Sequence, residues 1–256
     1  MPKLSDTRKI GSRTKIVASV VVFSALYTIL RHIQIIPMIG VPAGKFSASD
    51  ALAPLYGIIL GPYAGGLSVT LGTFLAIASG RSVAFLGLDF LPALANAVAI
   101  GSLIRRKWGP VVVLNAVLLL LFLLSPYSLL LVPIPLGSTT SSVPFAWLHI
   151  IAFIVLISPL GRKAAQWIET LKMPRITIAL VILAFIGTMM QHLTGNLVYQ
   201  LVLGPISGAK PGDLTGFWLS IFFVYPWERL VLVLLTVVIG TPLIRALKKS
   251  FFLFEK

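Results

Sequence analysis

Residues 46–66 read FSASDALAPLYGIILGPYAGG, and this stretch decides the fold. It begins with a short polar segment that carries Asp50, continues as an apolar helix, and reaches a Gly-Pro step before a glycine-rich helix. Gly61-Pro62 is predicted to end one helix and to start the next, because proline disrupts a helix interior. A carboxylate at the mouth of an apolar helix is costly in lipid, so we expect Asp50 to face a bundle interior, a water-filled vestibule or the interface. An ordinary tight hairpin in some other polytopic protein has the same pattern.

The composition places the chain in a membrane. Hydrophobic residues make up 57% of it and charged residues 11%, and its mean hydropathy is +0.99. Repeated apolar runs in such a chain are typical of membrane-spanning helices. The absence of cysteine excludes disulfides, thiolate metal sites and cysteine nucleophiles. We predict an all-α, polytopic transmembrane helical bundle in which residues 1–256 form a single integral membrane domain.

About eight stretches are predicted to cross this membrane. The second is short, roughly 18 Å of helix against a hydrocarbon core of about 30 Å, so short helices surround Gly61-Pro62. A basic segment, 1–14, precedes the first span, and a basic tail, 245–256, follows the last. The predicted spans are 15–36, 49–60, 62–79, 89–104, 110–132, 144–160, 175–201 and 217–244.

The basic residues predict the orientation. The chain has 21 lysines and arginines and a net charge of +14. With eight spans and the N-terminus inside, sixteen of the 21 lie on the cytoplasmic side, which is the positive-inside pattern. The high charge therefore indicates topology and attraction to anionic lipid in the bilayer, not a nucleic-acid partner. We expect a multi-pass protein of the plasma membrane with both termini cytoplasmic. The five basic residues that fall elsewhere are Arg31, Lys45, Arg81, Lys210 and Arg229.

Three connections are longer than the rest. The inner one, 162–174, has Trp167, Ile168 and Leu171 at helical spacing, which predicts either a short interfacial helix or a plain solvated connector. The outer ones, 133–143 and 204–216, are rich in proline, glycine and serine and are candidates to cap a site.

Catalytic signatures are missing from the sequence. It contains no H-E-x-x-H, G-x-S-x-G or P-loop motif, and no paired carboxylates at catalytic spacing on one helix. We therefore expect no enzyme activity, no metal and no other cofactor. The chain is expected to bind a small-molecule substrate or to support a complex that does, and an intramembrane enzyme is a third, weaker hypothesis.

Polar side chains gather at one depth, in the outer half of the predicted bundle. His192, Asn196 and Tyr199 follow i, i+4, i+7 spacing and so share one helix face. A purely internal hydrogen-bond network between spans would have the same composition as a binding site. The predicted substrate-binding residues are Lys45, Ser49, Asp50, Asp89, Trp147, His149, Gln191, His192, Asn196, Tyr199, Tyr225, Glu228 and Arg229.

Two adjacent charges in the last span need partners. An unpaired Glu228 or Arg229 costs at least about 2.5 kcal/mol near a helix centre, so both are expected to face inward. Adjacent residues on a helix point about 100° apart. We therefore expect Arg229 to neutralise Asp50 or Asp89, which leaves Glu228 for His192 or a ligand.

The run SDALAPLYGIILGPYAGG at 49–66, preceded by the first span and the polar loop Gly44-Lys45-Phe46, resembles a known family. Residues 15–104 resemble the substrate-binding S component of energy-coupling factor (ECF) vitamin transporters. The resemblance implies a helical bundle that holds a vitamin or similar micronutrient in an outward-facing pocket, under the loop between the first two spans. It also implies a transmembrane coupling subunit and two cytoplasmic ATPase subunits as partners.

The chain departs from this family in two ways. Members usually have six helices, whereas eight spans are predicted here, the later ones within 110–244. The family's first helix often carries an alanine-x-x-x-alanine coupling surface, and the nearest equivalent here is Ser24 with Thr28. Small residues let helices approach closely, so Ser24, Thr28, Gly65 and Gly66 are the predicted docking positions. The alternative function is a non-catalytic structural or accessory subunit of a larger membrane complex.

The eight-span topology is tested by cysteine labelling in intact cells. Arg106→Cys and Lys163→Cys should be shielded from an impermeant external thiol reagent, because both positions lie on the predicted cytoplasmic side. Lys210→Cys should be labelled. Labelling of Arg106→Cys from outside would overturn the eight-span topology.

Overall fold

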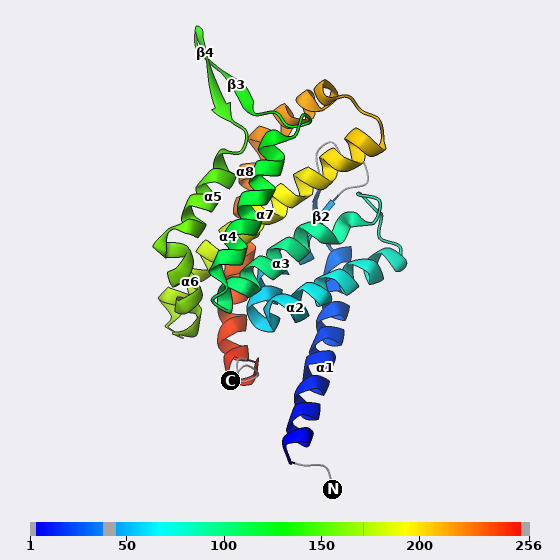
Figure 1. Ribbon diagram of the computed structural model, residues 1–256, viewed down its shortest axis with the longest axis vertical. Helices are drawn as coiled ribbons and strands as arrows, with labels where there is room; N and C mark the ends of the chain where they lie inside the picture. The colour runs from blue at the N-terminus through cyan, green and yellow to red at the C-terminus, as the bar shows by residue number, and fades with distance from the viewer. Residues whose placement is uncertain (1–3, 38–44, 171, 252–256) are drawn as a thin grey trace.

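The computed structural model describes residues 4–37, 45–170 and 172–251. Helices make up 79% of the structure and pack side by side as a bundle, which confirms an all-α helical membrane protein (Figure 1). In the described residues, four helices are long and apolar enough to cross a membrane, or five with one bent pair. Two shorter apolar helices accompany them. The count of eight spans and the cytoplasmic termini stay predictions.

The elements follow one another mostly as helices, with two short β-hairpins between them. The helices are α1 (Leu4–His32), α2 (Ala48–Ala78), α3 (Leu91–Ile104), α4 (Trp108–Leu124), α5 (Trp147–Ile157), α6 (Pro159–Glu169), α7 (Met173–Leu201) and α8 (Thr215–Phe251). The short helical turns are η1 (Leu88–Phe90), η2 (Val202–Ile206) and η3 (Pro211–Leu214). The strands are β1 (Gln34–Pro37), β2 (Lys45–Ser47), β3 (Leu131–Leu136) and β4 (Thr139–Pro144), paired antiparallel as β1-β2 and β3-β4.

The predicted break at Gly61-Pro62 is present in the middle of α2. Gly61 has φ 79° and ψ 178°, a backbone conformation that residues other than glycine rarely adopt. Gly65 lies so close to the preceding half that a Cβ there would be 2.6 Å from the carbonyl oxygen of Tyr56. Residues nine apart in a straight helix are about 13 Å apart along the axis. The chain therefore reverses at Gly61, and the two halves of α2 pack against each other.

The central helix of the bundle is α7, which is in contact with α2, α3, α4, α5, α6 and α8. One core cluster joins it to α2 and α3, through side chains such as Leu55, Ile100 and Leu183. A second, aromatic cluster includes Phe122, Trp218 and Tyr225. Because α7 is surrounded, its polar side chains must find partners inside the protein.

Large apolar side chains cover the outside of several helices. Val17, Val21 and Ile29 of α1 are exposed, as are Leu120 of α4 and Val238 of α8. Such surfaces are unfavourable in water and favourable in lipid. The exposed faces agree with the membrane assignment made from composition.

The structure differs from the sequence prediction at four segments. The outer segment 133–143 is not an irregular loop but most of the β3-β4 hairpin, which projects from the helices (Figure 1). The predicted span 110–132 is shorter in the structure, because α4 ends at Leu124. The predicted span 144–160 bends by 67° at the break between α5 and α6. A helix is present in 162–174, but Ile168 is buried in the core and Leu171 lies outside the described residues.

The two predicted cytoplasmic loops with basic residues lie together. Arg106, after α3, is 3.0 Å from the carboxylate of Glu169 at the end of α6. Arg162 stacks on Trp108, with its guanidinium carbon 3.9 Å from the ring centroid. This contact of the two loops agrees with their placement on one side of the membrane.

The residues predicted to dock a coupling subunit make contacts inside the chain, and their docking role stays a prediction. Thr28 donates hydrogen bonds to the carbonyls of Ser24 and Gly72, so this face of α1 packs on α2. Gly65 faces the first half of α2, and Gly66 packs against side chains of α3.

The hairpin in α2 is tested by adding bulk at its closest approach. Gly65→Leu should lower the free energy of unfolding by about 1–3 kcal/mol, because backbone atoms occupy the space that the side chain needs. Gly109→Leu is the matched control, since nothing lies within 4 Å of a Cβ there. Equal thermal unfolding temperatures for the two variants would contradict the packed hairpin.

Candidate functional site

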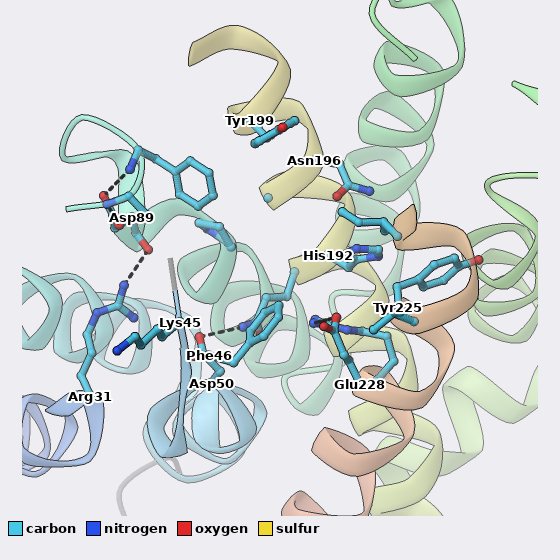
Figure 2. Close-up of a pocket in the computed structure, with 18 of the residues that line it drawn as sticks. Arg31, Lys45, Phe46, Asp50, Asp89, His192, Asn196, Tyr199, Tyr225 and Glu228 are labelled. Carbon is cyan, nitrogen blue, oxygen red and sulfur yellow. Dashed lines mark hydrogen bonds and ion pairs between the residues drawn. The ribbon is translucent and has the colours of Figure 1, made fainter. Parts of the chain in front are cut away.

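A cavity of about 90 Å³ lies between the end of α1, β2, the loop after α2, α7 and α8 (Figure 2). One buried water needs roughly 10–15 Å³, so the cavity has room for several waters or a small organic molecule. Ten of the thirteen predicted binding residues line it, namely Lys45, Asp50, Asp89, Gln191, His192, Asn196, Tyr199, Tyr225, Glu228 and Arg229. The face of α7 predicted from spacing therefore points into one cavity.

One side of the cavity is basic. Arg81 donates hydrogen bonds of 2.7 Å to two backbone carbonyls, those of Arg31 and Lys45, and so joins the end of α1 to β2. Arg31 donates to the backbone carbonyl of Asp89 at 3.3 Å. Burial and the neighbouring guanidinium of Arg31 lower the pKa of Arg81 from its ordinary value, whereas nearby Asp50 and Asp89 raise it. Among the described residues, no carboxylate forms an ion pair with the side chain of Arg31, Lys45 or Arg81.

The two aspartates of the cavity are bonded to neutral donors. Asp50 accepts from the backbone N–H and the hydroxyl of Ser47, at 2.7 and 2.9 Å, and so caps the start of α2. Asp89 accepts from the backbone N–H groups of Ala84 and Phe85, at 2.9 and 3.1 Å, and orders the loop after α2. Both carboxylates thus hold the walls of the cavity in place.

A chain of amides connects Asp50 to the core. Gln191 donates to the carboxylate of Asp50 at 3.2 Å and accepts from Asn96 at 2.8 Å. The side-chain amide of Asn96 in turn lies against Gly187, so that a Cβ on residue 187 would collide with it. These contacts link α2, α3 and α7 behind the cavity.

The opposite side of the cavity is aromatic. The rings of His192 and Tyr225 stack with their centroids 4.9 Å apart and an angle of 26° between their planes. His149 lies beside His192, with their centroids 5.1 Å apart and 17° between their planes, and the two imidazoles share a hydrogen bond of 3.1 Å. Further along α7, Tyr199 stacks on Phe217 at 3.9 Å. Figure 2 shows Arg31 and Lys45 on one side and His192 and Tyr225 on the other.

The prediction that Arg229 pairs with Asp50 or Asp89 is wrong. Its guanidinium is 3.5 Å from the carboxylate of the adjacent Glu228, and it lies over the ring of Phe46 at 4.8 Å. It forms no ion pair with Asp50 or Asp89. The long side chains of neighbouring residues can bend toward each other, although their Cβ atoms point about 100° apart.

Several buried N–H groups of the lining have no partner among the described residues. They are Nε of Arg31, Nε of Arg229 and Nδ2 of Asn196. These side chains are 8%, 2% and 5% exposed, so bulk water does not replace the missing acceptors. An unsatisfied buried donor costs about 1–3 kcal/mol. The cavity therefore offers donors that a bound molecule or internal waters can use.

Three predicted residues do not line the cavity. Ser49 bonds to the hydroxyl of Ser47, His149 lies behind His192, and Trp147 begins α5. The loop 204–216 also contributes no lining residue. The prediction missed eleven lining residues: Arg31, Phe46, Arg81, Ser82, Ala84, Phe85, Pro92, Gly195, Phe217, Ile221 and Val224. Arg31 and Arg81 could have been predicted as site residues, because both are basic residues placed away from the predicted cytoplasmic side.

Within the described residues, no three His, Asp or Glu side chains are close enough to hold a metal ion. The chain was compared with protein-family models, with curated proteins and with solved structures, and it matches none of them.

The role of Asp89 in ordering the cavity wall is tested by Asp89→Asn. One acceptor oxygen becomes an N–H donor that faces a backbone N–H, so the loop after α2 should loosen and stability should fall by about 1–3 kcal/mol. Amide hydrogen exchange at Ala84 and Phe85 should become faster. Asp213→Asn is the control, because its carboxylate accepts a comparable 2.7 Å bond from the N–H of Lys210 at an exposed site. Unchanged exchange at Ala84 would show that Asp89 does not order the loop.

Proposed function

We propose that the protein is the substrate-binding component of a membrane transport system for a small organic molecule of the vitamin or micronutrient type. The cavity holds this molecule and opens to the outside, and both termini lie in the cytoplasm. The proposal assigns the chain a binding role and no catalytic step.

One observation carries this proposal. Residues from five segments that are distant in the sequence converge on one cavity. Three of these residues, Arg31, Asn196 and Arg229, have buried N–H donors without acceptors among the described residues. Most ligand sites combine an apolar or aromatic wall with a few convergent polar groups. The His192–Tyr225 wall and the open donors of Arg31, Arg229 and Asn196 have this combination.

The resemblance to ECF S components supports a proposal about partner subunits. The sequence carries no nucleotide-binding motif, so the chain cannot by itself couple ATP hydrolysis to uphill transport. We propose that it works with a transmembrane coupling subunit and two ATPase subunits. Ser24, Thr28, Gly65 and Gly66 stay the predicted docking positions, although they also make contacts within the chain.

A second function, as an accessory subunit of a larger membrane complex, is favoured by a different observation. Both aspartates of the cavity are already bonded within the chain, as an internal network requires. In that case the cavity holds water only, and its polar residues serve to join helices.

The proposed function is tested by filling the cavity. Gly195 lines it, and a Cβ there would have only Pro92 nearby, at an ordinary contact distance of 3.8 Å. Gly195→Trp should place a ring in the cavity without disturbing the backbone. Mass spectrometry of small molecules released from purified protein should find one compound with wild type and with the control Gly109→Trp, but not with Gly195→Trp. No difference between the three proteins would contradict the proposed function.

The accessory role predicts a different result for Asn196→Ala. The side chain of Asn196 has no hydrogen-bond partner for Nδ2 in the described residues, so its loss should leave the melting temperature nearly unchanged while the released compound decreases. An internal network predicts the reverse, a lower melting temperature from lost interhelical bonds of about 0.6 kcal/mol each.

A further inference from the structure

We propose that the cavity selects a small organic monoanion with a flat ring, its acidic group on the Arg31 side and its ring on the His192–Tyr225 wall. This inference rests on the proposed function and gives its ligand a chemical class.

The first support is the balance of charge in the lining. Four cations and three carboxylates face the cavity, so the lining is one negative charge short of neutrality. Arg31, Arg81 and Arg229 are buried, whereas Lys45 is exposed, so water solvates the excess charge until an anion binds and neutralises it. The cations are Arg31, Lys45, Arg81 and Arg229, and the carboxylates are Asp50, Asp89 and Glu228.

The second support is the direction of the missing hydrogen bonds. The oxygens of Asp50 and Asp89 already accept from groups of the protein. The atoms left without partners on the two arginines are donors, Nε of Arg31 and Nε of Arg229. A carboxylate can accept from an arginine fork with charge-assisted bonds, which are roughly twice as strong as neutral ones. A cationic ligand would leave these donors unsatisfied.

The third support comes from the distribution of basic residues along the chain. Only five lie away from the predicted cytoplasmic side, and four of these, Arg31, Lys45, Arg81 and Arg229, meet at this one cavity. Anchoring to anionic lipid does not require them to converge. Binding of an anion does.

The aromatic wall defines the other end of the molecule. His192 and Tyr225 stack on each other, so a bound ring can lie on an outer face of this pair. The pair is held in place by the hydrogen bond between His149 and His192 and by the one from Tyr225 to the carbonyl of Phe145. Offset stacking of a planar ring on such a surface contributes about 0.5–1.5 kcal/mol beyond the area that it buries. Figure 2 shows His192 and Tyr225 across the cavity from Arg31 and Lys45.

The test uses two probes of nearly equal shape, benzoate and benzamide, titrated calorimetrically into the full-length protein in lipid nanodiscs. Benzoate should bind roughly tenfold more tightly, a difference of about 1.4 kcal/mol, because charged hydrogen bonds are roughly twice as strong as neutral ones. Cyclohexanecarboxylate, which has the charge but no flat ring, should bind more weakly than benzoate.

Variants assign the preference to the basic side of the cavity. Arg31→Gln should weaken the binding of benzoate more than that of benzamide and so remove the preference. Lys45→Gln is a second variant at an exposed position, where loss of folding is not expected, and it should reduce the preference in the same direction. Lys210→Gln is the matched control, an exposed lysine on the same predicted side but outside the cavity, and it should change nothing.

Two outcomes overturn the inference. Equal binding of benzoate and benzamide, or no binding of either at millimolar concentration, shows that the cavity does not select an anion. The proposed function is judged separately, by whether Gly195→Trp depletes a compound that copurifies with wild type. A depleted compound that is neutral or cationic leaves the proposed function intact and refutes the anionic class.

Discussion

A charge inside an apolar bundle must be paired, bonded or hydrated, and this constraint shapes the half of the protein that contains the cavity. Each charged group there has a structural consequence. Asp50 caps α2, Asp89 orders the following loop, and Arg81 joins the end of α1 to β2. The Nε atoms of Arg31 and Arg229 are left without an acceptor among the described residues. The cavity is therefore rigid in its walls and rich in donors toward its interior.

The backbone makes this arrangement possible. The reversal at Gly61 brings the second half of α2 beside the first, and so the loop that holds Arg81 and Asp89 returns to the same end of the bundle as Asp50. The position of α7 in the centre then lets one helix face supply the back of the cavity. A substitution that disturbs the hairpin would thus affect a site that is far away in sequence.

Much of this could be predicted from local pattern. Gly61-Pro62 requires a helix break wherever it occurs, and the i, i+4, i+7 spacing of His192, Asn196 and Tyr199 fixes a shared face on any helix. The pairing of Arg229 with Glu228 could not be predicted, because it depends on side-chain bending and on the packing of Phe46 above the guanidinium. The packing of Ser24 and Thr28 on α2 also could not be predicted, since small residues permit close packing with a neighbouring helix of the same chain and with a partner subunit alike. The β3-β4 hairpin was missed although Val132 and Ile134 alternate toward the core, because Pro133 and Pro135 between them are typical of loops.

The most direct measurement is an experimental map of the purified protein in lipid, at a resolution that separates ordered water from an organic molecule. If the cavity binds an aromatic monoanion, the map should show continuous flat density on the His192–Tyr225 wall, with an acidic group within hydrogen-bond distance of the Arg31 guanidinium. Separate water peaks that bridge Arg31, Asn196 and Arg229, with no organic molecule present, would contradict this proposal and would identify the cavity as part of an internal network.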